Sequence, residues 1–90
     1  FKFKKLTAQE MLVFSTIYEL EEKGIIVDYI LLSERLKLSE ISIRDYIRKL
    51  ISKGIPLLKN KENNKKITLS ISQDLKKIAS LSTIVQLRKL

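Results

Sequence analysis

The 90-residue sequence contains neither cysteine nor histidine. Without cysteine, the chain forms no disulfide bridge and has no thiolate nucleophile. Without either residue, it cannot assemble a zinc site of the usual kind or a catalytic triad built on histidine or cysteine. We therefore expect no bound metal, no cofactor and no enzymatic activity.

Long apolar runs are also absent. The longest are 11–14, 24–27 and 29–32, whereas a helix that spans a bilayer needs roughly 20 apolar residues. No segment resembles a secretory signal, so we expect a cytoplasmic protein without a membrane partner. The chain begins at Phe1 instead of a methionine, which we interpret as processing or excision from a longer protein.

What the sequence does have is positive charge. Its 18 Lys and Arg against 10 Asp and Glu give a net charge of +8, and 44% of its residues are hydrophobic, as in an ordinary globular domain. Residues 54–90 carry most of the excess, because they contain eight basic and two acidic side chains. Such a balance is typical of nucleic-acid-binding proteins, and less often of proteins that bind acidic membranes or acidic partners.

Helix-start and helix-stop signals divide the first 54 residues. Thr7 and Glu10 have the spacing of a capping box, and Asp28 and Ser39 are suitable N-cap residues. Apolar residues recur at helical spacing behind each of these starts. The predicted helices span about 8–23, 29–36 and 40–53. Gly24 is expected to end the first of them.

After Gly54, which is expected to end the third helix, the periodicity changes. Pro56 prevents the helix from continuing, and apolar and polar residues then alternate. The segments expected to form a hairpin are strands at about 55–59 and 67–72, with a turn at 60–66. A further short strand is predicted at 25–27, because its residues are β-branched.

The last 18 residues predict one helix over 73–90. Its apolar residues are mostly spaced by three, so they drift around a helix of 3.6 residues per turn and cannot all face one neighbour. We expect part of this surface to cover the helix at 8–23 and part to form a homodimer. The predicted dimer or partner contacts are Leu81, Ile84, Val85, Leu87 and Leu90. The alternative is a helix that folds back entirely on its own domain.

Residues 1–5 are expected to form an N-terminal arm, in which aromatic and basic residues alternate. Such an arm could enter a DNA minor groove or pair as an edge strand. A frayed terminus is the interpretation we favour.

The segment 32–50 resembles the helix-turn-helix of bacterial and archaeal regulators. Leu32 and Leu36 occupy the apolar positions of the first helix of that motif, and Ser39 precedes the second. The exit at 53–57 is similar to that of the biotin-repressor type of winged helix, and the opening at 6–10 resembles the MarR type. The resemblance implies a mainly α fold with a small β-hairpin, namely a winged helix-turn-helix. It comprises a three-helix core and a wing within 6–72, and a C-terminal helix completes a single domain over 1–90.

Two departures from this pattern affect the expected site. Lys37 stands where the pattern usually has glycine, so either the turn is wider or Lys37 adopts a left-handed backbone at a cost of roughly 1 kcal/mol. Glu40 and Asp45 place acidic groups near the face that would meet phosphate. A carboxylate can accept a hydrogen bond from cytosine, but it more often weakens DNA binding.

The resemblance implies sequence-specific binding of double-stranded DNA by a transcriptional regulator associated with the nucleoid. The helix at 40–53 would enter the major groove, and arginine there suits guanine. The expected base contacts are Ile41, Ser42, Arg44 and Arg48. The expected backbone contacts are Lys37, Ser39, Lys49, Lys59, Lys61, Lys65 and Lys66.

Other functions fit the same residues. The charged side chains could form only a solvated surface, with Arg44, Asp45 and Arg48 as a charge cluster. A winged helix that binds proteins inside a replication, division or transcription assembly is the main alternative, and an RNA-binding winged helix is a smaller one.

Overall fold

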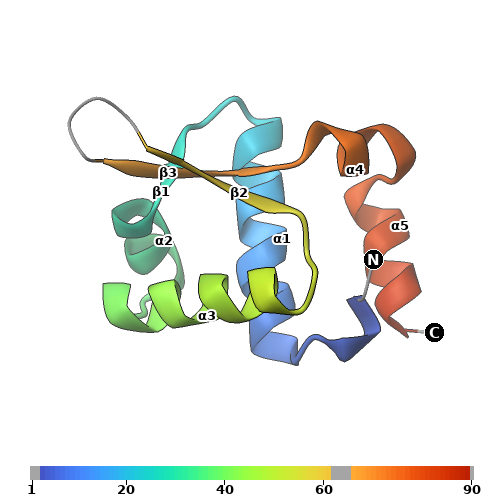
Figure 1. Ribbon diagram of the computed structural model, residues 1–90, viewed down its shortest axis with the longest axis horizontal. Helices are drawn as coiled ribbons and strands as arrows, with labels where there is room; N and C mark the ends of the chain where they lie inside the picture. Colours follow the sequence, from blue (N-terminus) through green and yellow to red (C-terminus); the bar gives the residue numbers. More distant parts are fainter. Residues whose placement is uncertain (1–2, 62–65, 90) are drawn as a thin grey trace.

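The structure is a computed structural model that describes residues 3–61 and 66–89 (Figure 1). It is mainly helical with a small antiparallel sheet, as predicted. Along the chain, the elements are η1 (Phe3–Lys5, a 3-10 turn), α1 (Ala8–Glu22), β1 (Val27–Asp28), α2 (Tyr29–Leu36), α3 (Glu40–Ser52), β2 (Leu57–Lys61), β3 (Ile67–Ile71), α4 (Gln73–Ile78) and α5 (Leu81–Lys89). The middle of the predicted turn, including Lys65, and the C-terminal Leu90 lie outside the described residues.

The three predicted helix starts are confirmed. Thr7 and Glu10 form the full capping box, with N–O distances of 2.8 and 3.1 Å. Asp28 and Ser39 each accept a hydrogen bond from the backbone N–H three residues ahead, at 2.7 and 3.1 Å. Each cap satisfies a backbone donor that has no partner inside its helix, so the sequence fixes where each helix begins.

The helix ends depend on left-handed backbone. Gly24 and Gly54 have φ values of 76° and 85°, and each is followed by a residue whose N–H donates to a carbonyl in the last turn of the helix. This is the Schellman arrangement, which favours glycine because no Cβ crowds the backbone. Lys37 ends α2 at φ 57° and ψ 43°, so the left-handed alternative is the correct one for this turn.

The sheet has the strand order β1-β3-β2. The predicted hairpin is present, and Lys59 lies opposite Leu69 in it. Strand β2 begins at Leu57 instead of 55, because the N–H of Ile55 is still bonded to the α3 carbonyl of Leu50. The short strand lies at Val27–Asp28 and pairs with the other edge of β3, which makes a third strand.

The C-terminal segment is two helices, so the prediction of one helix over 73–90 is wrong. Ala79 is extended, with φ −153° and ψ 132°, and its carbonyl accepts a hydrogen bond from the Tyr18 hydroxyl at 3.1 Å. The change of direction lets both Leu75 and Ile84 reach the core, where they are 1% and 0% exposed. One straight helix could not place these residues, nine positions apart, on the same core, because of the drift of its apolar positions.

The core surrounds α1, which stands between α2 and α3 on one side and α4 and α5 on the other (Figure 1). Phe3 belongs to this core: it is 2% exposed, and its ring centroid lies 5.1 Å from that of Phe14 in an edge-to-face arrangement. The expectation of a frayed arm is therefore wrong for residues 3–5. Burial of a large aromatic side chain offsets the entropy of ordering the terminus.

The predicted partner surface on α5 is mostly used within the chain. Ile84 is fully buried, and Leu81 and Val85 pack against the core. These three residues were expected to contact a second copy, and for Ile84 that expectation is wrong, since its side chain has no exposed area. Only Leu87 is substantially exposed among the predicted contacts in the described part of α5. The helix folds back on its own domain because the break at Ala79 redirects it.

A buried ion pair joins the start of α1 to the end of α3. Glu10 is 2% exposed, and its Oε1 lies 2.6 Å from Lys53 Nζ, which also donates to the Lys5 carbonyl at 3.0 Å. Burial raises the pKa of Glu10, but hydrogen bonds from Lys53 and from the Thr7 N–H, together with the Lys53 charge, leave this pKa below its ordinary value. The pair therefore fixes the position of α3 against α1.

Candidate nucleic-acid interface

The helix α3 has one buried face and one free face. Ile43, Ile47 and Leu50 are fully buried, because their spacing of four and three residues places them on one side of the helix. The opposite side presents Ile41, which is 81% exposed, and Arg44. A hydrophobic side chain this exposed contributes nothing to the core and is available to a ligand.

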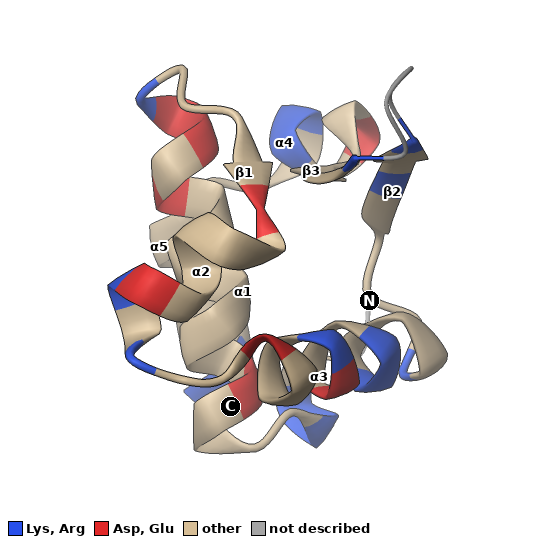
Figure 2. Ribbon diagram, turned by 90° about the vertical axis from the view of Figure 1, so that its left-hand side faces the viewer, with Lys and Arg blue, Asp and Glu red and all other residues tan. Residues whose placement is uncertain are grey.

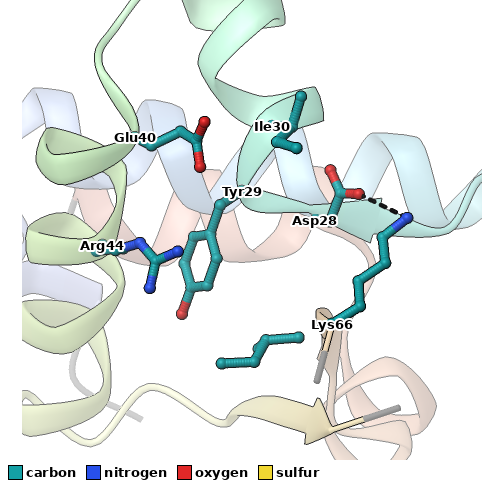
Figure 3. A pocket seen from close by; sticks show the side chains of 7 residues that line it. Asp28, Tyr29, Ile30, Glu40, Arg44 and Lys66 are labelled. Atoms are coloured by element: carbon teal, nitrogen blue, oxygen red, sulfur yellow. Dashed lines mark ion pairs between the residues drawn. The ribbon is translucent and has the colours of Figure 1, made fainter. Parts of the chain in front are cut away.

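Arg44 is held by a side chain from another helix. Its guanidinium carbon lies 4.5 Å from the centre of the Tyr29 ring, and Tyr29 is only 6% exposed at the start of α2. Burial raises the pKa of the Tyr29 hydroxyl, and the Arg44 charge partly opposes that rise. The ring face attracts the cation and limits its freedom, as Figure 3 shows for Arg44 beside Tyr29. Arg44 forms no ion pair within the described residues.

Arg48 and Lys49 are held differently, because both bond to Asp45. Arg48 Nη2 donates to Asp45 Oδ1, and Lys49 Nζ lies 3.0 Å from Asp45 Oδ2. The hydrogen bond from Lys49 has the larger effect and that from Arg48 the next, and both lower the pKa of Asp45. The carboxylate is therefore charged. Red and blue therefore adjoin on α3 in Figure 2. Both cations are partly neutralised by their own helix.

The hairpin supplies further cations beside α3. Lys59 and Lys61 are exposed on β2, and neither forms an ion pair within the described residues. Lys66 Nζ lies 3.1 Å from Asp28 Oδ2. Burial raises the pKa of Asp28, but the hydrogen bonds that it accepts from the Leu31 N–H and Lys66 leave this pKa below its ordinary value. Lys65 lies outside the described residues.

These side chains surround an open hollow between α2, α3 and the sheet, which we call the α3–hairpin groove. One part, of about 400 Å³, is lined by Asp28, Tyr29, Ile30, Glu40, Arg44, Lys66 and Ile67. An adjoining part, of about 380 Å³, shares Tyr29, Arg44 and Ile67 and extends to Ile41, Asp45, Arg48 and Lys59. Figure 3 shows Tyr29 and Arg44 on one side and the Asp28–Lys66 ion pair on the other. The structure thus brings predicted base contacts and predicted backbone contacts to one surface.

The remaining predicted residues lie in the turn and in the first turn of α3. Ser39 and Ser42 bond to each other: the Ser39 hydroxyl donates to Ser42 Oγ at 3.0 Å and accepts from the Ser42 N–H. Lys37 is exposed at the left-handed end of α2.

Sequence reasoning missed two features of the groove. Tyr29 supports Arg44 although it belongs to a different helix, and Asp28 serves both as a helix cap and as the partner of Lys66. Nothing in the spacing of these residues indicates such contacts. The charge cluster of Asp45 and Arg48, in contrast, follows from a spacing of three on one helix.

Comparisons with known proteins give no support for a family. No family model, no curated protein and no solved structure matches the chain. Among residues 3–61 and 66–89, acidic side chains form no group of three or more that could hold a metal ion. None of the helices in this part of the chain is long and apolar enough to cross a bilayer.

Proposed function

We propose that this protein is a winged helix-turn-helix domain that binds double-stranded DNA as a transcriptional regulator. The observation that carries the proposal is the α3–hairpin groove. The free face of α3, with Ile41 and Arg44, and Lys59 of β2 flank one hollow. A major groove about 12 Å wide accepts an α-helix, so α3 reaches bases while the hairpin lies along the phosphates.

The side chains on α3 suit the reading of bases. Arginine donates two parallel hydrogen bonds to O6 and N7 of guanine, and Arg44 is held on Tyr29 without an ion pair among the described residues. Ile41 offers an apolar surface to a thymine methyl group. Arg48 must first leave Asp45, so we assign it a smaller share of the sequence preference.

The side chains on the hairpin suit phosphate. Lysine is a flexible point charge that attracts phosphate without distinguishing sequences. Lys59 and Lys61 are exposed and without an acidic partner among the described residues. Their contribution is therefore to affinity and orientation.

A titration of the protein with duplex DNA tests this proposal. We expect binding that weakens steeply between about 50 and 200 mM salt, because phosphate contacts release counterions. We also expect a selected sequence to bind about 1,000-fold more tightly than a random one, as is typical of specific regulators. Absence of binding at the lower salt concentration would refute the proposal.

Variants in the same titration test the division of work between helix and hairpin. The double variant Arg44→Ala, Arg48→Ala should reduce the preference for the selected sequence. The double variant Lys59→Ala, Lys61→Ala should weaken binding to both duplexes alike and lower the salt dependence by about one unit for each lost phosphate contact. If the two variants behave identically, the assignment of roles is wrong.

A second candidate function is binding of another protein in the same groove. Ile30 and Ile41 are 54% and 81% exposed at its rim, and three carboxylates, from Asp28, Glu40 and Asp45, line it. Acidic groups reduce attraction to phosphate, and exposed apolar groups favour a protein surface. Weak binding to DNA without preference for any sequence would favour this candidate.

A further inference from the structure

A second basic surface lies at the end of the molecule away from the hairpin. Figure 1 shows the hairpin at one end of the longest axis, which extends 40 Å, and η1 beside the last turn of α5 at the other. We call the surface at this second end the basic end. Its cations are Lys4, Lys5, Lys53, Arg88 and Lys89.

Two hydrogen bonds bring these cations together. Lys53 Nζ, at the end of α3, donates to the carbonyl of Lys5 at 3.0 Å. Arg88 Nη2, on α5, donates to the carbonyl of Leu6 at 3.1 Å. The end of α3, the end of α5 and the η1 turn therefore meet at two consecutive peptide groups.

Acidic groups are scarce at the basic end. Residues 3–5 and 81–89 contain no Asp or Glu, and Glu10 is buried and already bonded to Lys53 and Thr7. The α3–hairpin groove differs, because carboxylates alternate with its cations. Among the described residues, Lys4, Lys5, Arg88 and Lys89 therefore have no acidic partner, as is also true of Lys59 and Lys61 on β2.

Helix stability does not explain all of these cations. A cation in the last turn of a helix interacts favourably with the helix dipole, which suffices for Lys53 and Lys89. Lys4 and Lys5, in contrast, lie just before the start of α1 at Thr7. There the dipole disfavours positive charge. Both side chains are exposed and form no ion pair within the described part of the chain.

We propose that the basic end is a second, sequence-independent binding surface for the phosphate backbone of duplex DNA. Lysine suits such contacts because it attracts phosphate as a point charge and carries no information about sequence. The surface is separate from the α3–hairpin groove, so the proposal does not depend on that groove binding DNA. A protein with both surfaces holds a duplex, or two segments of DNA, at opposite ends.

The test uses a triple variant, Lys4→Gln, Lys5→Gln, Lys89→Gln, titrated with a labelled random-sequence duplex. The control variant is Lys23→Gln, Arg35→Gln, Lys77→Gln, which removes the same charge from exposed positions elsewhere. Circular dichroism and thermal unfolding establish that both variants fold. Because all six side chains are exposed, we expect unfolding to change little.

We expect a weaker salt dependence of DNA binding in the variant Lys4→Gln, Lys5→Gln, Lys89→Gln and not in its control. Three lost phosphate contacts lower the slope of log affinity against log salt by about 2.7. Its affinity deficit relative to the unchanged protein should therefore shrink about 40-fold between about 50 and 200 mM salt. Equal changes in both variants, or no change in either, would overturn the proposal.

The same titration separates this proposal from the proposed function. If the basic-end variant loses binding while Arg44→Ala has no effect even on a selected sequence, the basic end binds DNA and the α3–hairpin groove does not. If Arg44→Ala relaxes sequence preference and the basic-end variant matches its control, the groove binds DNA and this inference is wrong.

Discussion

The buried Glu10–Lys53 pair gives a prediction about stability that depends on which partner is removed. Glu10 has a side chain 3% exposed, whereas that of Lys53 is 30% exposed. Lys53→Met leaves a carboxylate without its cation inside the protein. This costs about 3 kcal/mol, the lower end of the range for removing one partner of a buried ion pair. Glu10→Gln leaves a lysine that reaches water and still bonds to the Lys5 carbonyl. It loses one charge-assisted hydrogen bond, about 1–2 kcal/mol.

Both costs decrease as the pH falls, for different reasons. The pKa of Glu10 is lowered in the folded protein, so its charge stabilises the fold above its ordinary pKa of 4.5. This stabilisation is lost as the pH falls through the lowered value. Gln at position 10 has no charge to lose, so the stability deficit of Glu10→Gln relative to the unchanged protein shrinks on acidification. In Lys53→Met, burial raises the pKa of Glu10 without the opposing effect of Lys53. Glu10 therefore takes up a proton as the pH falls, and the stability deficit of this variant shrinks as well.

Urea unfolding at pH 7 and pH 4 measures both effects. Lys77→Met is the control, because Lys77 is exposed and lies on α4, away from this pair. We expect the free energy of unfolding at pH 7 to fall in the order control, Glu10→Gln, Lys53→Met. If Glu10→Gln costs as much as Lys53→Met, or if neither deficit changes with pH, the buried pair does not stabilise the fold in this way.

Three further predictions concern single positions. Lys37→Gly removes the strain of a left-handed lysine but gives the unfolded chain more freedom, so it should stabilise the fold by about 0.5–1 kcal/mol. The unfolding temperature should rise by a few degrees, and a lower unfolding temperature would contradict this. Gly54→Ala adds a Cβ that meets no atom within 4 Å, so its whole cost is the backbone at φ 85°, about 1–2 kcal/mol; Gly54→Asn should cost less in the same assay. Asp45→Asn releases Arg48 and Lys49 and should tighten binding to random duplex several-fold with a steeper salt dependence, whereas unchanged affinity would mean that neither cation meets phosphate.

Local signals account for the parts of the fold that the sequence predicts. Thr7 with Glu10, Asp28 and Ser39 determine helix starts through contacts within three residues. Gly24 likewise ends its helix through its own backbone freedom. These features need no knowledge of the tertiary structure, so sequence reasoning finds them.

Contacts between distant residues account for the errors. At the break, Ala79 accepts a hydrogen bond from the hydroxyl of Tyr18, 61 positions earlier, and Ser80 caps α5 by accepting from the Thr83 N–H. Phe3 packs against Phe14. Apolar residues spaced three positions apart indicate that one straight helix cannot bury them all. This spacing does not reveal where the helix breaks. The burial of Ile84 follows from that break, so the predicted dimer contact is wrong at this residue.

The candidate site was predicted in the same uneven way. The residues of α3 and β2 that line the groove follow from the positions of one helix and one hairpin. The sequence does not show which of these cations is held away from an acidic partner, because Arg44 is positioned by Tyr29 from α2. The basic residues of 54–90 are divided among the hairpin, α4 and the end of α5, and the sequence alone does not show how these lie in space.

Backbone amide NMR signals, followed during a titration with a selected duplex, show whether the α3–hairpin groove binds duplex DNA. Binding in this groove should give the largest shifts at residues 40–49 of α3 and at Lys59, Lys61 and Lys66 of the hairpin, with Tyr29 shifting as Arg44 engages a base. Shifts confined to other surfaces, or no shifts at about 50 mM salt, where phosphate contacts are strong, would contradict it.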